Sequence, residues 1–404
     1  MSEATTEHGA PPVRMDHNAT TDLRPEVAGR WRALTEAGLG NPSSLHASGR
    51  AARDVVDQAR EQVAAALGVH EDEVTFTAGG TEANNLALFG RAARLSRDAL
   101  VVGGPTEHAS VQRVLDRLEA AGRPVRRLAV DGRGRVNPEQ LAFLLESRPV
   151  GLVTLQAANS EVGTVQPLEE LAALLGPRGR GPTLHVDAVQ ALGRLPLDLR
   201  GALDRVDLLA LSLHKVGGPL GVGVLVRRKG TALASPLVGG GQEEGLRPGT
   251  ENAAAIGAAA LAVELAVRDR AHQAATWREL AGDLWAGLAE DLPGVELLGP
   301  PLDAPEQRLP NTLGLRVPGQ DARLLVTRLD MLGLECSAGS ACSSGAVEAS
   351  HVLLAMGLDE RAAREGLRLS LGRNTTASDC KRARAILVKV ISPLLATRDT
   401  PHDL

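Results

Sequence analysis

Residues 74–85 read Val-Thr-Phe-Thr-Ala-Gly-Gly-Thr-Glu-Ala-Asn-Asn, a short apolar strand followed by two glycines and the start of a helix. Two glycines before a helix leave backbone N–H groups free, and the helix dipole favours an anion there. The stretch contains neither the lysine of a nucleotide P-loop nor a G-x-G-x-x-G dinucleotide motif. These residues alone therefore favour a phosphate-binding turn and a plain tight turn about equally.

The alternation of apolar strand and helix continues along the chain from this stretch. The predicted helix 51–67 carries its apolar residues on one face and stops at Gly68. Alternating strands and helices predict an α/β fold with a mostly parallel sheet, covered on both faces, that binds ligands at the carboxyl ends of its strands. The predicted strands are 74–77, 99–103, 125–130, 152–155, 183–186, 207–211 and 222–226.

The chain has 404 residues, enough for one large domain or roughly two to three ordinary ones. A Gly-rich passage ends the alternation, and a long Ala-rich helix is predicted at 252–292. A Pro- and Gly-rich connection follows, and then a mixture of short strands and helices. We expect a flexible tail at 1–12, a large domain at 13–255 and a smaller C-terminal domain at 256–404.

Composition narrows the class of protein. Lys and Arg number 44 against 49 Asp and Glu, and the only aromatic residues are three Trp and three Phe. Such a chain has no basic excess for a phosphate backbone and few rings for base stacking, which disfavours nucleic acid as a direct ligand. No apolar run is long enough to cross a membrane, and the polar N-terminus has no signal-peptide core. Three cysteines fit a reducing cytoplasm.

Two charged residues stand where predicted strands end. Asp187 would cap a helix, form an ion pair, or place a fixed negative charge against a cationic ring nitrogen. Most lone lysines are solvated, but Lys215 lies between an apolar strand and a Gly/Pro turn, where desolvation would allow a Schiff base. An amine, a carboxylate and a phosphate turn together are the groups that pyridoxal 5'-phosphate requires.

The segment 336–345 surrounds Cys342 with small residues, which is typical of an exposed loop. We predict that Cys342 is a nucleophile, since such a loop gives its thiol access. Cys336 and Cys380 are expected to be buried as small apolar residues. A metal site with His351 is disfavoured, because one C-x5-C pair without a second pair is a weak signal.

A histidine and an arginine complete the candidates. His108 follows a predicted strand and would either lie over a cofactor ring or stand at the exposed start of a helix. Arg368 has apolar neighbours, so its guanidinium would bind a carboxylate or form an internal ion pair. Arg373 is the weaker candidate because polar residues follow it.

Taken together, these motifs resemble the cysteine desulfurases (NifS- and IscS-like proteins) of the class V pyridoxal-phosphate-dependent aminotransferase family. The resemblance implies a fold-type I transferase, with a seven-stranded large domain and a smaller α/β domain, that forms a homodimer. The matching stretches cover essentially the whole chain in the family's order. They are 15–21, 40–46, 77–85, 106–108, 185–190, 212–215, 247–250, 336–345 and 367–373.

The same resemblance implies a role for each position. Lys215 would hold the cofactor and move the substrate's α-proton, while Cys342 would attack the sulfur of bound cysteine. Asn41 and Arg368 would bind the substrate carboxylate, and Thr250 would reach the phosphate from a second subunit. The remaining cofactor contacts would be Gly80, Thr81, His108, Asn159 or Ser160, Asp187, Gln190, Ser212 and His214. The family commonly has two Asn where this chain has Asn159 and Ser160, so the choice between them stays open.

The implied activity is conversion of L-cysteine to L-alanine, with the sulfur carried as a persulfide on Cys342 for iron–sulfur cluster assembly or tRNA thiolation. The implied partner is a sulfur-acceptor protein, either an iron–sulfur scaffold or a tRNA-thiolating enzyme. A selenocysteine lyase or another class V enzyme is the alternative activity. A non-catalytic accessory subunit is a third reading, and the presence of Lys215, Asp187 and Cys342 argues against it.

Overall fold

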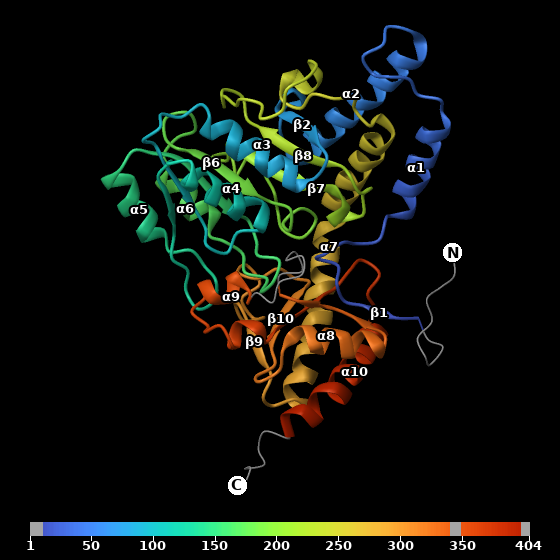
Figure 1. The fold of residues 1–404 in the computed structure, drawn as a ribbon. Coiled ribbons are helices and arrows are strands. Elements are labelled where there is room, and N and C mark those ends of the chain that lie inside the picture. Colours follow the sequence, from blue (N-terminus) through green and yellow to red (C-terminus); the bar gives the residue numbers. More distant parts are fainter. Residues whose placement is uncertain (1–10, 340–348, 397–404) are drawn as a thin grey trace.

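The computed structural model describes residues 11–339 and 349–396 and places a seven-stranded sheet in the larger part of the molecule (Figure 1). The strand order is β2-β8-β7-β6-β5-β3-β4, and all pairs except those of β8 are parallel. All seven predicted strands are confirmed. They are β2 (Val74–Thr77), β3 (Leu100–Gly103), β4 (Val125–Arg127), β5 (Val150–Gln156), β6 (Thr183–Asp187), β7 (Leu208–Ser212) and β8 (Gly223–Arg227).

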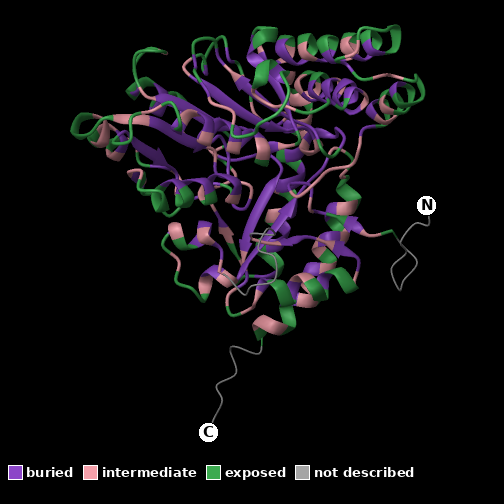
Figure 2. Ribbon diagram, turned by 45° about the horizontal axis from the view of Figure 1, so that its top comes forward, coloured by how far each residue is buried: buried purple, intermediate pink, exposed green. Residues whose placement is uncertain are grey.

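Helices cover both faces of this sheet, as the strand–helix alternation predicts. One face packs against α2, α5, α6 and the first half of α7, and the other against α3 and α4. Figure 2 shows the strands buried between these layers, with the exposed residues on the outer helix faces and the loops. The helices are α1 (Pro25–Glu36), α2 (Ala47–Leu67), α3 (Gly80–Ala92), α4 (Ala109–Ala120), α5 (Pro138–Ser147), α6 (Leu168–Leu174) and α7 (Ala253–Asp291).

The smaller part is built on a four-stranded antiparallel sheet of order β12-β13-β10-β9. Helices α8 and α10 pack against this sheet, and their buried residues form a second hydrophobic core with it. Its elements are β9 (Glu296–Leu298), β10 (Thr312–Arg316), α8 (Ala322–Met331), β11 (Leu334–Glu335), β12 (Ser337–Ala338), α9 (His351–Ala355), β13 (Gly366–Ser370) and α10 (Ala377–Ala396).

The two cores divide the chain differently from the expected boundary at residue 255. Helix α7 has 39 residues and is about 58 Å long, enough to pack against both cores. Its residues Ala253–Ala266 lie in the first core, and Trp277 begins the part that lies in the second. The N-terminal segment also joins the smaller part, because β1 (Val13–Arg14) pairs with β11. Its two-residue strand is too short to leave a periodic signal in the sequence.

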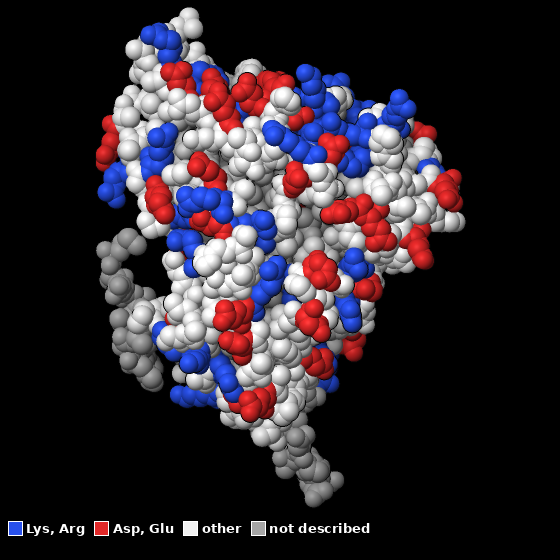
Figure 3. Space-filling model, turned by 180° about the vertical axis from the view of Figure 1, so that it is seen from behind, with Lys and Arg blue, Asp and Glu red and all other residues white. Residues whose placement is uncertain are grey.

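Within residues 11–339 and 349–396, no helix combines the length and apolar character needed to cross a membrane. Basic and acidic side chains are interspersed over the face drawn in Figure 3. The feature that matters for function is the carboxyl edge of the large sheet, which faces the smaller part. Asp187 ends β6 there, beside Gln156 of β5 and Ala210 of β7.

Candidate active site

The phosphate turn predicted from the sequence lies against the end of β7. A Cβ atom added to Gly80 would stand 2.8 Å from Val189 Cγ2 and 3.2 Å from Ser212 Cβ, so only glycine allows this approach. The first turn of α3 thereby sits directly beside Ser212. Thr81 is the next residue of that turn and is exposed. An anion bound here would meet the N–H groups of α3 together with the hydroxyl groups of Thr81 and Ser212.

Asp187 is 6% exposed and receives two hydrogen bonds from neutral donors. The backbone N–H of Val189 donates to Oδ1 over 3.0 Å, and Asn84 Nδ2 donates to Oδ2 over 2.8 Å. Among the described residues no Lys, Arg or His forms an ion pair with this carboxylate. Its negative charge is therefore held in place but not neutralised, which suits a cationic ring nitrogen.

His108 stands at the N-terminus of α4 as its cap residue. Its Nδ1 accepts from the backbone N–H of Ser110 over 3.1 Å and lies 2.8 Å from Ser110 Oγ. His108 thus takes the exposed helix-start position, one of its two predicted alternatives. Ser110 Oγ also receives a hydrogen bond from Asn84, which connects His108 to the partner of Asp187.

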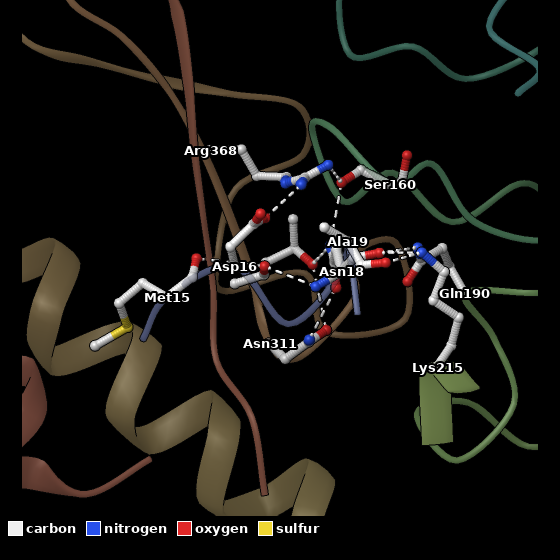
Figure 4. Close-up of polar contacts among 11 residues, drawn as sticks. Met15, Asp16, Asn18, Ala19, Ser160, Gln190, Lys215, Asn311 and Arg368 are labelled. Atoms are coloured by element: carbon white, nitrogen blue, oxygen red, sulfur yellow. Dashed lines mark hydrogen bonds and ion pairs between the residues drawn. The ribbon is translucent and has the colours of Figure 1, made fainter. Parts of the chain in front are cut away.

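Lys215 lies in the short helix η2 (Leu213–Val216) directly after β7. Its Nζ donates to the backbone carbonyls of Asn18, at 2.7 Å, and Ala19. Gln190 Nε2 donates to the same Asn18 carbonyl over 3.0 Å, and its Oε1 is buried with no partner among the described residues. Figure 4 shows how the Asn18 backbone brings Lys215 and Gln190 together.

Asn18 also connects these two residues to the smaller part. Its side chain donates to Ser160 O over 3.1 Å and to Thr312 Oγ1 over 2.9 Å, and it accepts from Asn311 Nδ2. The sequence analysis attached no role to Asn18 itself. The signal that could have marked it is a run of polar residues, 16–18, in a segment that turns out to be largely buried.

Arg368 is 4% exposed and forms the internal ion pair that the sequence analysis gave as one alternative. Its Nη2 lies 2.6 Å from Asp16 Oδ1, and Nη1 donates to Ser160 O over 3.3 Å. Its Nε is buried without a partner among the described residues. Two of the three guanidinium nitrogens thus have partners, Nη2 with Asp16 and Nη1 with Ser160, while Nε has none among the described residues (Figure 4).

His214 neighbours Lys215, and its Nδ1 lies 3.0 Å from Thr20 Oγ1. Burial lowers the pKa of His214 to about 4, and the positive charge of Lys215 adds to the lowering. At neutral pH the imidazole is therefore uncharged. An uncharged imidazole can still donate one hydrogen bond to a phosphate oxygen.

Glu107 is a buried acid beside the site that the sequence analysis did not single out. Its Oε1 accepts from the backbone N–H of Gln156, and its Oε2 has no partner among the described residues. Complete burial holds the pKa of Glu107 well above its usual range, and the negative charge of Asp187 adds to the rise. The raised pKa favours the protonated form, which places no second negative charge near Asp187.

The side chain of Asn159 forms hydrogen bonds within its own loop and with Thr106. Asn159 is 2% exposed, its Nδ2 donates to Thr106 O, and its Oδ1 accepts from the N–H groups of Glu161 and Val162. Ser160 is only partly buried, and its carbonyl faces Asn18 and Arg368. The Asn159 side chain is thus taken up by contacts within its own loop and with Thr106, whereas Ser160 is only partly buried.

Three predicted residues are not brought into this cluster. Asn41 is exposed in the turn before α2, where its Oδ1 accepts from Ser43 N, and no hydrogen bond within the described chain joins it to Arg368. Thr250 is exposed in the connection before α7. Cys342 lies outside the described residues. The buried positions expected for Cys336 and Cys380 are confirmed, and burial raises the pKa of the Cys336 thiol to about 12.

Pyridoxal 5'-phosphate fits the groups that are present. The un-neutralised carboxylate of Asp187 suits its ring nitrogen, the amine of Lys215 suits its aldehyde, and the turn at Gly80 suits its phosphate. Gln190, with its amide at the same edge, could contact the phenolic oxygen. The donor set thus matches each end of the cofactor.

A fold of this topology with such a site defines a fold-type I pyridoxal-phosphate enzyme. The family model described as aminotransferase class-V matches residues 13–382, and the chain belongs to that family, whose members depend on pyridoxal 5'-phosphate. Within the family it belongs to the cysteine desulfurases.

Individual relatives support this assignment over nearly the full length of the chain. It is 40% identical to the cysteine desulfurase of Cereibacter sphaeroides, covering 95% of this chain and 97% of that one. It is 36% identical to the cysteine desulfurase IscS of Dictyoglomus turgidum, covering 95% of each. A solved structure named as a NifS-like protein superposes with a TM-score of 0.86 at 34% identity, over 94% of this chain and 99% of the other.

The buried Glu107 carboxyl predicts a specific pH dependence of stability. In the unfolded chain it ionises near its ordinary pKa, whereas in the folded protein its pKa is raised. The folded state then binds the extra proton, so the stability of the parent falls as pH rises from about 5. Glu107→Gln cannot titrate. The melting temperature of the variant minus that of the parent should rise from pH 5 to pH 8, and a constant difference would contradict the raised pKa.

The lowered pKa of His214 predicts which substitutions at this position preserve the affinity for pyridoxal 5'-phosphate. Because the ring acts as an uncharged donor, His214→Gln should keep the pyridoxal 5'-phosphate affinity of the apoenzyme within about threefold. His214→Ala should weaken it by about tenfold, the effect of losing one hydrogen bond to a charged group. Titration of the apoenzymes with the cofactor measures both. Equal losses in the two variants would contradict the role of an uncharged donor that glutamine can fill.

Proposed function

We propose that the protein is an L-cysteine desulfurase that releases L-alanine and takes the sulfur onto Cys342 as a persulfide. The observation that carries the proposal is that Lys215 and Asp187 lie at the carboxyl edge of the large sheet and that Asn18 and Ser160 connect this edge to Arg368 of the smaller part, in a chain that belongs to the cysteine desulfurases. A similar solved structure is named "SspA in complex with cysteine", at 29% identity and a TM-score of 0.74, covering 89% of this chain and 98% of the other. That name supports cysteine as the substrate.

Arg368 is the residue that would bind the substrate carboxylate. Its guanidinium is 4% exposed and is already oriented by Asp16 and by the carbonyl of Ser160. A planar guanidinium held on two sides has little rotational freedom left to lose when a carboxylate arrives. Its Nε, which has no partner within residues 11–339 and 349–396, offers one N–H for that contact.

Lys215 would act on the substrate's α-hydrogen. When bound, pyridoxal 5'-phosphate supplies an electron sink for the carbon atoms of the attached amino acid. The carbonyls of Asn18 and Ala19 accept from the Lys215 ammonium, so the amine has a defined place from which to take and return a proton. Asp187 would keep the ring nitrogen charged throughout.

The sulfur transfer balances without an outside oxidant. The Cys342 thiolate attacks the substrate sulfur, an S–S bond forms, and the Cβ–S bond of cysteine breaks. The electron pair stays on the former Cβ, which takes up a proton and becomes the methyl group of alanine. The transferred sulfur is oxidised and the carbon is reduced, so cysteine and one thiol give alanine and one persulfide.

The proposal extends to partners and place of action. The persulfide would pass to a sulfur-acceptor protein, either an iron–sulfur scaffold or a tRNA-thiolating enzyme. The exposed position of Thr250 agrees with its expected role in a homodimer, where it would reach the neighbouring subunit's phosphate. A cytoplasmic location, expected from the three thiols, belongs to the same proposal.

Cys342→Ser tests the persulfide role directly. The hydroxyl of serine cannot accept the sulfur, so alanine formation from cysteine should fall at least a hundredfold while the absorbance of the bound cofactor is unchanged. Formation of alanine is the measurement, under conditions without added thiol.

The matched control is Cys380→Ala, which removes a thiol that is buried in the smaller part. It should retain alanine formation within about twofold. Undiminished turnover in Cys342→Ser would refute the persulfide on that residue.

A further inference from the structure

Asn84 in helix α3 links two of the residues expected to contact the cofactor. Its Nδ2 donates to Asp187 Oδ2 over 2.8 Å and to Ser110 Oγ over 2.9 Å. Ser110 Oγ in turn lies 2.8 Å from His108 Nδ1. Asn84 is 1% exposed and Ser110 is 9% exposed, so solvent competes little for these bonds. The end of β6 is thereby connected to the start of α4.

The direction of each hydrogen bond follows from the groups involved. A carboxylate only accepts, so the amide of Asn84 donates to Asp187, and its second hydrogen goes to Ser110 Oγ. The hydroxyl hydrogen of Ser110 is then directed to His108 Nδ1, which also accepts from the Ser110 backbone N–H over 3.1 Å. A ring nitrogen that accepts carries no hydrogen, so neutral His108 holds its hydrogen on Nε2.

An amide is suited to this position because it is neutral. A lysine or arginine at residue 84 would neutralise Asp187 and compete with a cationic ring nitrogen for the same carboxylate. Asn84 orients the carboxylate and leaves its charge intact. Its own Oδ1 is buried with no partner among the described residues, so the side chain is held through its donor end.

The position of Asn84 in the helix adds a second constraint. It lies one turn after Gly80, which begins α3 at the phosphate turn. The same helix therefore supplies the turn expected to hold the phosphate and the side chain that orients the partner of the ring nitrogen. The distance between these two contacts is fixed by helix geometry and not by a flexible loop.

We propose that Asn84 is a positioning residue that orients the Asp187 carboxylate and, through the Ser110 hydroxyl, directs a second hydrogen bond to Nδ1 of His108. The proposal rests on the proposed function, because it assigns Asp187 and His108 to the cofactor. It goes beyond that function by naming two residues that would not touch the cofactor themselves.

The test compares substitutions at Asn84 with the same substitutions at Asn85. Asn85 is its neighbour on α3, and its Nδ2 donates instead to the carbonyl of Thr81. Asn84→Ala should weaken binding of pyridoxal 5'-phosphate to the apoenzyme by about tenfold. Asn84→Asp should weaken it further, because a second carboxylate would face Asp187. Asn85→Ala and Asn85→Asp should remain within about twofold of the parent.

The second readout is the nitrogen-15 shift of His108 Nδ1 in the apoenzyme, measured by NMR of histidine-labelled protein and assigned with a His108→Asn spectrum. The parent should show hydrogen on Nε2 and an Nδ1 that accepts two hydrogen bonds. In Ser110→Ala the backbone N–H still donates to Nδ1, so the tautomer should be kept while the Nδ1 resonance shifts toward that of an imidazole with fewer hydrogen bonds. Asn84→Ala should shift it in the same direction, because the Ser110 hydroxyl loses the donor that orients it. Ser110→Thr, which keeps a hydroxyl, should restore the parent signal. This comparison does not depend on cofactor or activity.

The outcomes separate this inference from the proposed function. Cofactor affinities of the Asn84 variants that match those of the Asn85 variants would overturn the inference, as would a parent-like Nδ1 shift in both Asn84→Ala and Ser110→Ala. A parent that binds no pyridoxal 5'-phosphate would overturn the proposed function and leave the Nδ1 shift to decide the inference. If Asn84→Ala does not fold, the Ser110→Ala and Ser110→Thr pair decides it.

Discussion

Asp187 is a carboxylate buried at the end of the central strand β6. No Lys, Arg or His of the described residues forms an ion pair with it, and this constrains the choice of the side chains around it. Burying such a charge without donors or a partner costs several kcal/mol. The chain satisfies Asp187 with one backbone N–H and one amide, and complete burial raises the pKa of the neighbouring acid Glu107. The arrangement favours a positively charged ring nitrogen as the partner of Asp187, and the match to pyridoxal 5'-phosphate follows from that charge.

The rest of the site depends on how three separate segments meet at this edge of the sheet. The backbone of Asn18 accepts from Lys215 and Gln190, while its side chain reaches Thr312 in the smaller part (Figure 4). The N-terminal segment therefore sits between the two cores. This explains why it pairs with β11 although it stands at the beginning of the chain. Arg368 comes from the smaller part and completes the group.

The sequence predicted the features that are local along the chain. The seven strands, the turn at Gly80, and the positions of Asp187 and Lys215 at strand ends all follow from periodicity and from residue types at element boundaries. The contacts that give these residues their chemistry are long-range. Asn84 meets Asp187 across 103 positions and Asp16 meets Arg368 across 352, and no pattern within a single segment encodes such pairs. The raised pKa of Glu107 depends on burial, which only the packed structure reveals.

The attachment of the cofactor to Lys215 is the central claim, and one measurement tests it most directly. The purified protein is treated with borohydride, which makes the link between pyridoxal 5'-phosphate and a lysine permanent, and its peptides are then weighed by mass spectrometry. The account predicts the added mass on the peptide that contains Lys215. Absence of the added mass after incubation with the cofactor, or its location on another lysine such as Lys229, would contradict the account.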